Sequence, residues 1–302
     1  MVILKHSQRV RFGLQDLAAG VSRTCAGLRG RTRAGRYISS LLINPAEHRV
    51  VRIALRDGIY LYVDPAVDLQ ETIFWTGEYD RPVIRRMKQL LPPGAVALDV
   101  GANIGAYSVQ LGRALQDGGR LIAIEPVPAN VKRLRENVEV NGLAEVIEIV
   151  ETAVGDRHGV VRLRGADSAR GVAGNAVVAD SGVAASLTTI DSIAEQYALE
   201  RCDLMKLDIE GCEYAALRGA ERLLRRFRPV LYLELNAHWM SHFGWTVYDL
   251  LNYLEPLGYD LVNERGESLR TATGRAEIES AWAWQRGNAY GNGSRNRKSR
   301  RT

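Results

Sequence analysis

The sequence predicts an α/β enzyme domain built on a mostly parallel sheet with helices on both faces. An apolar strand runs into a glycine-rich turn at residues 96–105 and then into a helix. A second strand ends in Glu125, about 20 residues after Gly105, where a carboxylate can accept hydrogen bonds from a ribose diol. From residue 94 onward, apolar strands alternate with helical stretches, which is the pattern of a covered parallel sheet.

Composition agrees with a globular enzyme. The 302 residues can bury a full core, and 46% hydrophobic with 25% charged residues is ordinary globular usage. No apolar run reaches the length of about 18 residues that a membrane span needs, and early basic residues interrupt any signal-peptide core. The three cysteines, Cys25, Cys202 and Cys212, are scattered, which favours a reduced cytoplasmic protein without a disulfide framework or zinc cluster.

Charge is distributed unevenly along the chain. Residues 1–36 hold eight Lys and Arg against one Asp, and residues 291–302 hold five basic residues and no acid. The remaining body therefore carries a net charge of −7 within the total of +5. Such basic ends can contact nucleic acid, anionic lipid or another polyanion, or can be a solvated leader and a frayed tail.

The first ninety residues read as an extension to the main domain. We expect a helical segment over 8–42, interrupted by glycines, and then a hairpin of strands 50–55 and 59–63. Asp57-Gly58 between these strands indicates a type I′ turn. Residues 69–91 read as helix, broken near Gly77 and resumed at Pro82, because proline is tolerated in the first turn of a helix.

The main domain follows from residue 94. The expected strands are 95–100, 120–125, 147–152, 203–208 and 230–235, and the helices between them are 104–115, 127–141, 190–199 and 212–226. Residues 157–189, rich in small residues, read as a hairpin-like insertion with a mobile tip. A helix at 246–257 leads to two closing strands, 259–262 and 278–282, which we expect to be antiparallel, and the last dozen residues read as disordered.

The glycine turn indicates which cofactor the domain takes. Gly101 and Gly105 permit close backbone approach, and the helix that follows offers free N–H groups. The turn lacks the third glycine of a pyrophosphate cradle, and the Asp99 carboxylate would repel a pyrophosphate. Asp99 suits the ammonium group of S-adenosylmethionine, held directly or through water. The alternative is that Asp99 and the glycines only shape the turn.

Two further acids fit an adenosine. Glu125 can bind the ribose diol, and Asp156, after the third strand, can accept from the adenine amino group. The structural alternatives are a surface acid at a strand end for Glu125 and a turn-forming residue for Asp156.

An acidic run marks the reaction centre. Residues 205–213 place Lys206, Asp208, Glu210 and Glu213 at the end of the fourth strand, where parallel sheets bind ligands. Asp208 or Glu210 could take a proton from an acceptor hydroxyl. Lys206 could simply pair with an acid, and Glu213 could be a helix-start acid.

The end of the fifth strand adds candidates for catalysis and for metal binding. Glu234 and Asn236 follow that strand, and His238 lies just beyond as a further candidate base. Asp208, Glu234 and Asn236 together would make an oxygen-rich Mg²⁺ site, although a catalytic metal is not favoured.

Several motifs occur in the order of a known family. They are residues 96–105, Ala123-Ile124-Glu125-Pro126, Ala153-Val154-Gly155-Asp156, Thr189-Ile190-Asp191 and Lys206-Leu207-Asp208-Ile209-Glu210-Gly211, with Gly77-Glu78-Tyr79 upstream as an entry motif. Over residues 70–236 the chain resembles the FkbM-type family of S-adenosylmethionine-dependent methyltransferases. The lysine-initiated run is far more specific than the glycine turn.

The resemblance implies a class I, Rossmann-like methyltransferase fold with a seven-stranded sheet whose last strand is antiparallel. It implies O-methylation of a sugar, glycolipid or polyketide-type natural product. It places Asp99, Gly101, Asn103 and Glu125 at the cofactor, and Asp208 and Glu210 at the reaction centre. Family members often carry His where this chain has Cys212, so the base is expected to be Asp208, Glu210 or His238.

Other functions remain open from sequence. An RNA or protein methyltransferase could use the basic ends as a grip, but the Asn-Pro-Pro-Tyr-type motif is absent and nucleic acid is an unlikely partner. A non-catalytic scaffold is disfavoured by the intact acids, and a NAD-dependent oxidoreductase by the missing glycine. The acceptor is expected to be a small molecule or glycan with a hydroxyl group, bound by loops 60–80, 157–189 and 237–250. Candidate aromatics in them are Trp75, Tyr79, Trp239, Phe243 and Trp245.

The predicted organisation has four parts. They are a basic helical extension at 1–45, a hairpin with entry helices at 46–93, the methyltransferase domain at 94–287 and a basic tail at 288–302.

Overall fold

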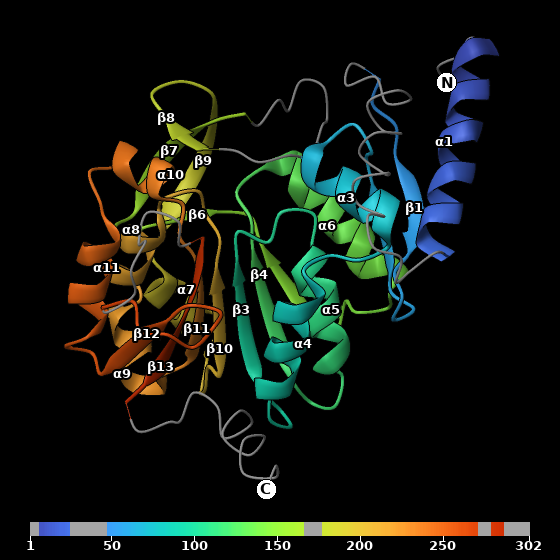
Figure 1. Ribbon diagram of the computed structural model, residues 1–302. Coiled ribbons are helices and arrows are strands. Elements are labelled where there is room, and N and C mark those ends of the chain that lie inside the picture. Colours follow the sequence, from blue (N-terminus) through green and yellow to red (C-terminus); the bar gives the residue numbers. More distant parts are fainter. Residues whose placement is uncertain (1–5, 25–46, 166–176, 271–278, 287–302) are drawn as a thin grey trace, which may run out of the picture.

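The computed structural model describes residues 6–24, 47–165, 177–270 and 279–286. The expected helix beyond residue 24, the tip of the insertion, Cys25 and the basic tail lie outside these residues. A central sheet has the strand order β12-β13-β11-β10-β3-β4-β5 (Figure 1). Its strands are β3 (Val96–Val100), β4 (Arg120–Ile124), β5 (Ile147–Val150), β10 (Leu204–Leu207), β11 (Val230–Glu234), β12 (Tyr259–Val262) and β13 (Ser280–Gln285). This seven-stranded sheet confirms the expected fold class.

The direction of the closing strands corrects one expectation. We expected both to be antiparallel, but only β13 is antiparallel to its neighbours. β12 pairs antiparallel with β13 and therefore points the same way as β11. The reason is the helical connection between β11 and β12, which returns the chain to the end of the sheet where β11 begins, as in any βαβ unit. β13 then turns back and fills the gap between the two.

Alternating side chains in the strands face two separate hydrophobic clusters. Ala97, Leu121 and Leu204 belong to one cluster, and their neighbours Leu98, Ile122 and Met205 belong to the other. The first cluster includes residues of α3 (Asp68–Thr76), α4 (Arg81–Leu90), α5 (Ala106–Ala114) and α6 (Pro128–Val140). The second includes residues of α7 (Ile190–Gln196), α8 (Glu213–Arg218), α9 (Glu221–Phe227), α10 (Ala237–His242) and α11 (Val247–Leu254). Both faces of the sheet are therefore covered.

The elements outside the main sheet refine other expectations. The break at Gly77 is confirmed, because its left-handed backbone ends α3 and its N–H bonds Ile73 O. The helix expected over 212–226 is two short helices, α8 and α9, separated at Gly219. A Cβ on Gly219 would lie 2.0 Å from Gly155 O, so this bend presses directly on the loop after β6 (Ala153–Val154). The insertion forms a second sheet, β6-β9-β7-β8, with β7 (Gly159–Arg164), β8 (Val177–Ala179) and β9 (Val183–Thr188).

The N-terminal hairpin forms as expected, but its turn differs. β1 (Val51–Ala54) pairs antiparallel with β2 (Tyr60–Val63). A type I′ turn needs positive φ at both central residues, and here Gly58 has φ 78° while Asp57 does not have positive φ. The N–H of Gly58 bonds Leu55 O at 3.1 Å, and Leu55 N–H bonds Ile59 O at 2.7 Å. The loop is therefore a type I turn followed by a left-handed glycine, so the predicted type I′ turn is wrong.

Two asparagines of α6 hold the free edge of β2. The Asn141 side chain accepts from Tyr60 N–H at 2.9 Å and donates to Tyr60 O at 2.7 Å. Asn137 accepts from Tyr62 N–H at 2.6 Å and donates to Ile104 O at 2.8 Å. Four residues of helix rise about 6 Å, and two residues of strand span about 6.6 Å, so the two amides match successive peptide groups of the strand.

We predict that Asn137→Ala lowers the free energy of unfolding by about 2 kcal/mol, because Asn137 is fully buried and its loss leaves Tyr62 N–H and Ile104 O without this partner. The half-buried Asn141 is the matched control, and Asn141→Ala should cost about 0.5–1 kcal/mol because water can replace its bonds. Urea unfolding of both variants measures the difference. Equal losses would contradict the role assigned to the buried amide.

Candidate active site

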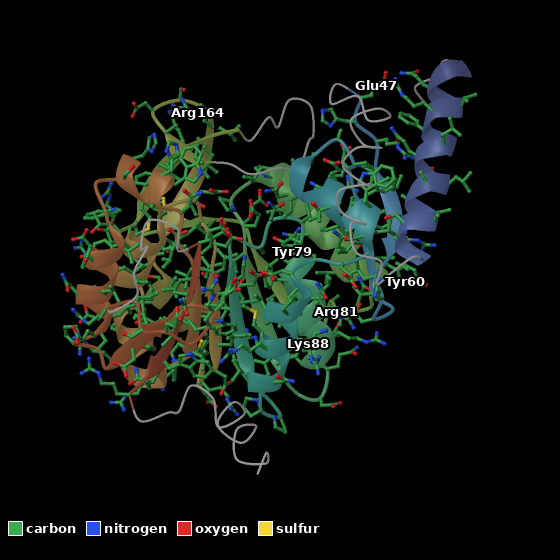
Figure 2. All side chains as sticks on the ribbon, viewed as in Figure 1. Glu47, Tyr60, Tyr79, Arg81, Lys88 and Arg164 are labelled. Carbon is green, nitrogen blue, oxygen red and sulfur yellow. The ribbon has the colours of Figure 1, made fainter. Side chains whose placement is uncertain are left out.

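A pocket lies at the carboxyl ends of β3, β4, β10 and β11, the edge where open parallel sheets bind ligands. Its lining combines the glycine turn, the residues after β4, and acids from the ends of β10 and β11. The upstream segment contributes Leu69 and Tyr79, and the insertion contributes Leu163 and Val178. Tyr79 lies near the centre of the molecule in Figure 2, whereas Arg164, at the end of β7, lies at the upper left periphery of the molecule.

The glycines of the turn are required by protein contacts. Gly101 has φ 77°, and a Cβ there would lie 1.9 Å from the backbone oxygen of Asp208. Gly105 has φ 87°, and a Cβ there would lie 2.5 Å from Leu134 Cδ1 on α6. Gly101 therefore lets the cofactor turn pack against the loop after β10, and Gly105 seats α5 against α6. Gly101 lines the pocket, while Gly105 does not.

Glu125 is held rigidly at the pocket wall. Its Oε2 accepts from Asn103 N–H at 2.9 Å, and its Oε1 accepts from Val127 N–H and Asn130 Nδ2, both at 3.0 Å. Burial raises the pKa of Glu125 to about 7, although these three hydrogen bonds oppose the shift. A carboxylate has about four acceptor positions, so one remains for a ligand hydroxyl. Asn130 was not anticipated from sequence, although it lies in the first turn of the helix that follows Glu125.

A polar row crosses the sheet beside the pocket. Strand register places Asp99 beside Lys206 and Lys206 beside Tyr232. The Lys206 ammonium is 3.2 Å from Asp99 Oδ1, 3.2 Å from Asp208 Oδ2 and 3.1 Å from Gly101 O. Burial alone would lower the pKa of Lys206, but the Asp208 and Asp99 carboxylates outweigh it and raise the pKa. Lys206 is therefore a permanent cation, hydrogen-bonded to the Gly101 carbonyl and ion-paired with both carboxylates.

Asp99 lies beneath the pocket and does not line it. Its side chain is fully buried, and its Oδ2 accepts from Ser108 Oγ at 2.6 Å. Its Oδ1 lies 3.2 Å from the Lys206 ammonium as an ion pair, without a hydrogen-bond partner. Asp99 contacts the site through Lys206, a role that the sequence alone did not indicate.

Asp208 and Glu234 form a carboxyl pair at the floor of the pocket. Both line the pocket, and Asp208 is close enough to Glu234 to influence its pKa. Burial of its carboxyl group, together with the neighbouring Asp208, raises the pKa of Glu234. Two close carboxylates repel each other when both are ionised, so the proton stays on Glu234, while Asp208 Oδ2 lies 3.2 Å from the Lys206 ammonium.

An aromatic cover lies over this pair. Tyr79 packs edge-on against Tyr107 with ring centroids 5.5 Å apart, and both line the pocket. Burial, and then the Asp208 charge, raises the pKa of Tyr79, so its hydroxyl is neutral. The Tyr107 hydroxyl donates to the Asp80 carboxylate. This bond links α5 to the start of α4 and fixes Tyr79 above the acids.

Backbone strain concentrates around the pocket. Five non-glycine residues within the described ranges have positive φ, and two of them, Asn103 (φ 50°) and Glu210 (φ 52°), line the pocket. A third, Asp80 (φ 37°), adjoins Tyr79. Such strain persists only where the surrounding structure imposes it, and it is typical of ligand sites.

The loop after β10 is supported from below by Glu213. Its Oε1 accepts from Ile209 N–H at 2.9 Å and from Gly211 N–H at 3.4 Å, while Oε2 is buried without a hydrogen-bond partner. Burial raises the pKa of Glu213 to about 7. Cys212 lines the pocket, and burial together with Glu213 raises the pKa of its thiol to about 12, so Cys212 is a neutral wall residue.

The other predicted site residues lie outside the pocket lining. Asp156 is 3.5 Å from Arg218 Nη1 and 3.6 Å from Arg157 Nη1. His238 is exposed on α10, where its ring contacts those of Trp239 and His242. The pocket wall near the insertion is instead apolar, because Val127 and Leu163 pack there with Val178.

Of the three predicted metal ligands, Asp208 and Glu234 line the pocket, but Asn236 does not. Asn236 caps α10 by accepting from Trp239 N–H at 3.2 Å, and Asp208 pairs with Lys206. Within the described ranges, no group of three or more His, Cys, Asp or Glu side chains is placed to hold a metal ion. Nor does any described helix have the length and apolar character to cross a membrane.

Of the aromatic candidates, only Tyr79 lines the pocket. Trp75 is buried in the core, and Trp245 packs on Tyr214 with ring centroids 4.6 Å apart. Trp239 lies against the histidines of α10. The pocket takes Tyr107 from α5 instead, a residue that the pattern of the sequence did not distinguish from core.

Part of the chain is similar in sequence to known methyltransferases. The model of the methyltransferase FkbM domain matches residues 99–261. A protein-L-isoaspartate O-methyltransferase of Aeropyrum pernix is 43% identical over 76 residues, which are 24% of this chain and 28% of that protein. A methyltransferase of Sordaria araneosa, sdnD, is 25% identical over 166 residues, 43% of this chain and 62% of its own length.

The matches also cover only part of each of these relatives. The chain spans less than two thirds of the length of the curated relatives named here. Among solved structures, a methyltransferase FkbM from Methylobacillus flagellatus is similar with a TM-score of 0.43 and 18% identity, covering 72% of this chain and 52% of that one.

We predict that Glu213→Gln makes stability less dependent on pH. The pKa of Glu213 is raised on folding, so its favourable contribution is present below about pH 4.5 and is lost as pH rises through about 7. Glutamine keeps the acceptor for Ile209 and Gly211 but cannot ionise. The variant should be more stable than the parent by about 1–3 kcal/mol at pH 8 and near equal at pH 5. Thermal unfolding across this pH range measures the effect, and parallel curves for both proteins would refute it.

Proposed function

This chain belongs to the FkbM methyltransferase family, and we propose that it transfers the methyl group of S-adenosylmethionine to a hydroxyl oxygen of a sugar, glycolipid or polyketide-type acceptor. The observation that carries the proposal is the Asp208 carboxylate, 3.2 Å from the Lys206 ammonium and in the same pocket as Glu234 and Glu125. A carboxylate there can accept a hydroxyl proton, while Glu125 can accept from a ribose.

The pocket residues fit the proposed cofactor. Glu125 retains one acceptor position for a ribose hydroxyl, and Asn103 and Asn130 lie beside it. The apolar wall of Val127, Leu163 and Val178 suits the faces of an adenine ring. We therefore assign Gly101, Asn103 and Glu125 to cofactor binding, with Gly105 shaping the turn.

The charge of the pocket fits a cationic methyl donor. Apart from Glu234, which holds a proton, the acids Glu125, Asp208 and Glu210 line it. Lys206 is the one Lys or Arg among the described lining residues, and its charge is already shared between Asp99 and Asp208. When bound, S-adenosylmethionine supplies an electrophilic methyl group on a sulfonium. An acidic pocket attracts that positive charge, whereas it would repel the pyrophosphate of a dinucleotide.

The protein's task in the reaction is alignment and proton removal. Asp208 accepts the acceptor's hydroxyl proton as the new oxygen–carbon bond forms and the sulfur–carbon bond breaks. Lys206 orients Asp208, and Asp99 orients Lys206 from below. Tyr79 covers the pocket and excludes water. Glu210, on the same loop as Asp208, is the remaining candidate base. His238 and Asp156 have no part in this scheme, because neither lines the pocket.

The acceptor is expected to enter between three segments. Leu69 and Tyr79 lie on one side, Leu163 on the insertion lies on another, and Glu234 lies on the floor. Tyr79 and Tyr107 present aromatic surface of the kind that packs on sugar rings. Labelled methyl transfer from S-adenosylmethionine into host extract, separated into glycan, lipid, small-molecule, RNA and protein fractions, tests the acceptor class. Label confined to RNA or protein would overturn it.

We predict that Asp208→Asn lowers kcat by about 10²–10³-fold and leaves the cofactor Kd within about threefold of the parent value. Asparagine preserves the shape of the side chain but cannot take the proton. Asp260→Asn, at an exposed acid paired with Arg286, is the control and should not change kcat. Single-turnover methyl transfer with calorimetric cofactor binding separates the two effects. A wild-type rate for Asp208→Asn would remove the base assignment.

We predict that cofactor affinity falls below pH 7, because Glu125 has a pKa of about 7 and its proton would occupy the one acceptor position left for a ribose hydroxyl. The probe is 5′-methylthioadenosine, which keeps the ribose diol but lacks the titrating amino acid group. Its calorimetric Kd should rise by up to about tenfold per pH unit below 7. The 2′-deoxy analogue should show a flatter profile. Identical profiles for the two probes would mean that Glu125 does not hold the diol.

A further inference from the structure

Helix α1 (His6–Thr24) is attached to the body of the protein by one face only. Gln15 and Ala19 are buried on that face. Arg23 Nη1 donates to Phe74 O at 2.5 Å, and Arg49 Nη2 donates to Asp16 Oδ1 at 2.7 Å. In Figure 1 the helix lies at the edge of the molecule, beside the hairpin and far from the insertion. The proposed methyl transfer uses none of its residues.

The opposite face of α1 is apolar and exposed. Val10, Leu14, Leu17 and Val21 are 51%, 51%, 67% and 55% exposed. Their 4-3-4 spacing places them in one stripe along the helix, about half a turn from Gln15 and Ala19. Only four other large apolar side chains in the described ranges are exposed, and they are spread over β1–β2, β7 and α11. This concentration is the signature of an interaction surface rather than of scattered exposure.

The sequence that contains the stripe is strongly basic. Residues 1–36 carry eight basic residues, and Asp16 is their only acid. The Asp16 carboxylate is bonded to both terminal nitrogens of Arg49, at 3.1 and 2.7 Å. The stripe therefore lies in a segment of net charge +7 whose one negative group is neutralised.

We propose that α1 docks the protein reversibly on an anionic lipid surface. Val10, Leu14 and Leu17 enter the boundary between headgroups and acyl chains, and the basic residues of the segment are attracted to the negative headgroups. Apolar insertion and charge act together here, and neither alone gives stable attachment.

Two other occupants fit the stripe less well. Nucleic acid is bound through its phosphates by basic side chains and through its bases by aromatic ones, and the exposed stripe of Val10, Leu14 and Leu17 offers neither. A second copy of the chain would bring two segments of charge +7 together, which is repulsive.

The experiment is co-sedimentation of the full chain with vesicles of phosphatidylcholine containing about 30% phosphatidylglycerol, compared with pure phosphatidylcholine. The parent protein should bind the anionic vesicles and dissociate as salt rises from about 0.05 to 0.5 M. Leu14→Gln/Leu17→Gln should weaken binding about tenfold or more, because both side chains would no longer enter the apolar layer. Val160→Gln, at a side chain 72% exposed on the insertion, is the matched control and should bind like the parent.

Cofactor binding by each variant, measured in the absence of vesicles, verifies that the fold is intact. The proposal is overturned if the parent ignores anionic vesicles at low salt, or if the double variant binds them as well as the control. It is also overturned if light scattering shows a dimer that the double substitution dissociates, since the stripe would then belong to a second copy. Loss of RNA binding in the double variant, without loss of vesicle binding, would assign it to nucleic acid.

Discussion

The buried ammonium group of Lys206 is the constraint on which the site depends. A cation taken out of water is costly unless charges and hydrogen bonds replace its hydration. Here three acceptors surround it: Asp99 below, Asp208 towards the pocket and the Gly101 carbonyl at the side. Exposure increases along this row, from 0% for Asp99 to 3% for Lys206 and 25% for Asp208. The interior of the sheet thus supplies a fixed positive charge to a carboxylate that meets the ligand.

Much of the fold could be predicted from the sequence, because it depends on periodic patterns. Apolar strands alternating with helices predicted the five central strands, and the break at Gly77 gave the entry helices. The direction of the closing strands was harder to predict. Whether β12 is parallel to β11 depends on the end of the sheet to which the intervening helices return the chain. The asparagine contacts of α6 were beyond reach, since Asn137 and Tyr62 lie 75 positions apart and neither residue type signals the other.

The site residues likewise differ in how far the sequence could predict them. Glu125, Asn103, Asp208 and Glu210 could be identified because each follows a recognisable strand, and all four line the pocket. His238 and Asn236 were chosen for their closeness to the end of β11, but α10 begins there and uses Asn236 as its cap. The role of Asp99 needed the strand register, which places Lys206 beside it across 107 positions of sequence. Closeness in sequence to a strand end predicted which residues line the pocket directly after a strand, but not beyond the next turn.

The contact at Gly101 couples the glycine turn to the loop after β10. Its α-carbon faces the backbone oxygen of Asp208 with no room for a methyl group. The turn proposed for the donor and the loop proposed for the acceptor must therefore move as one body. A change of acceptor cannot come from shifting the loop of Asp208, because the donor turn would shift with it. Specificity for the acceptor can instead change in the parts free of that contact, the insertion and the α3–α4 segment. Substitutions there would not alter the alignment proposed for methyl transfer.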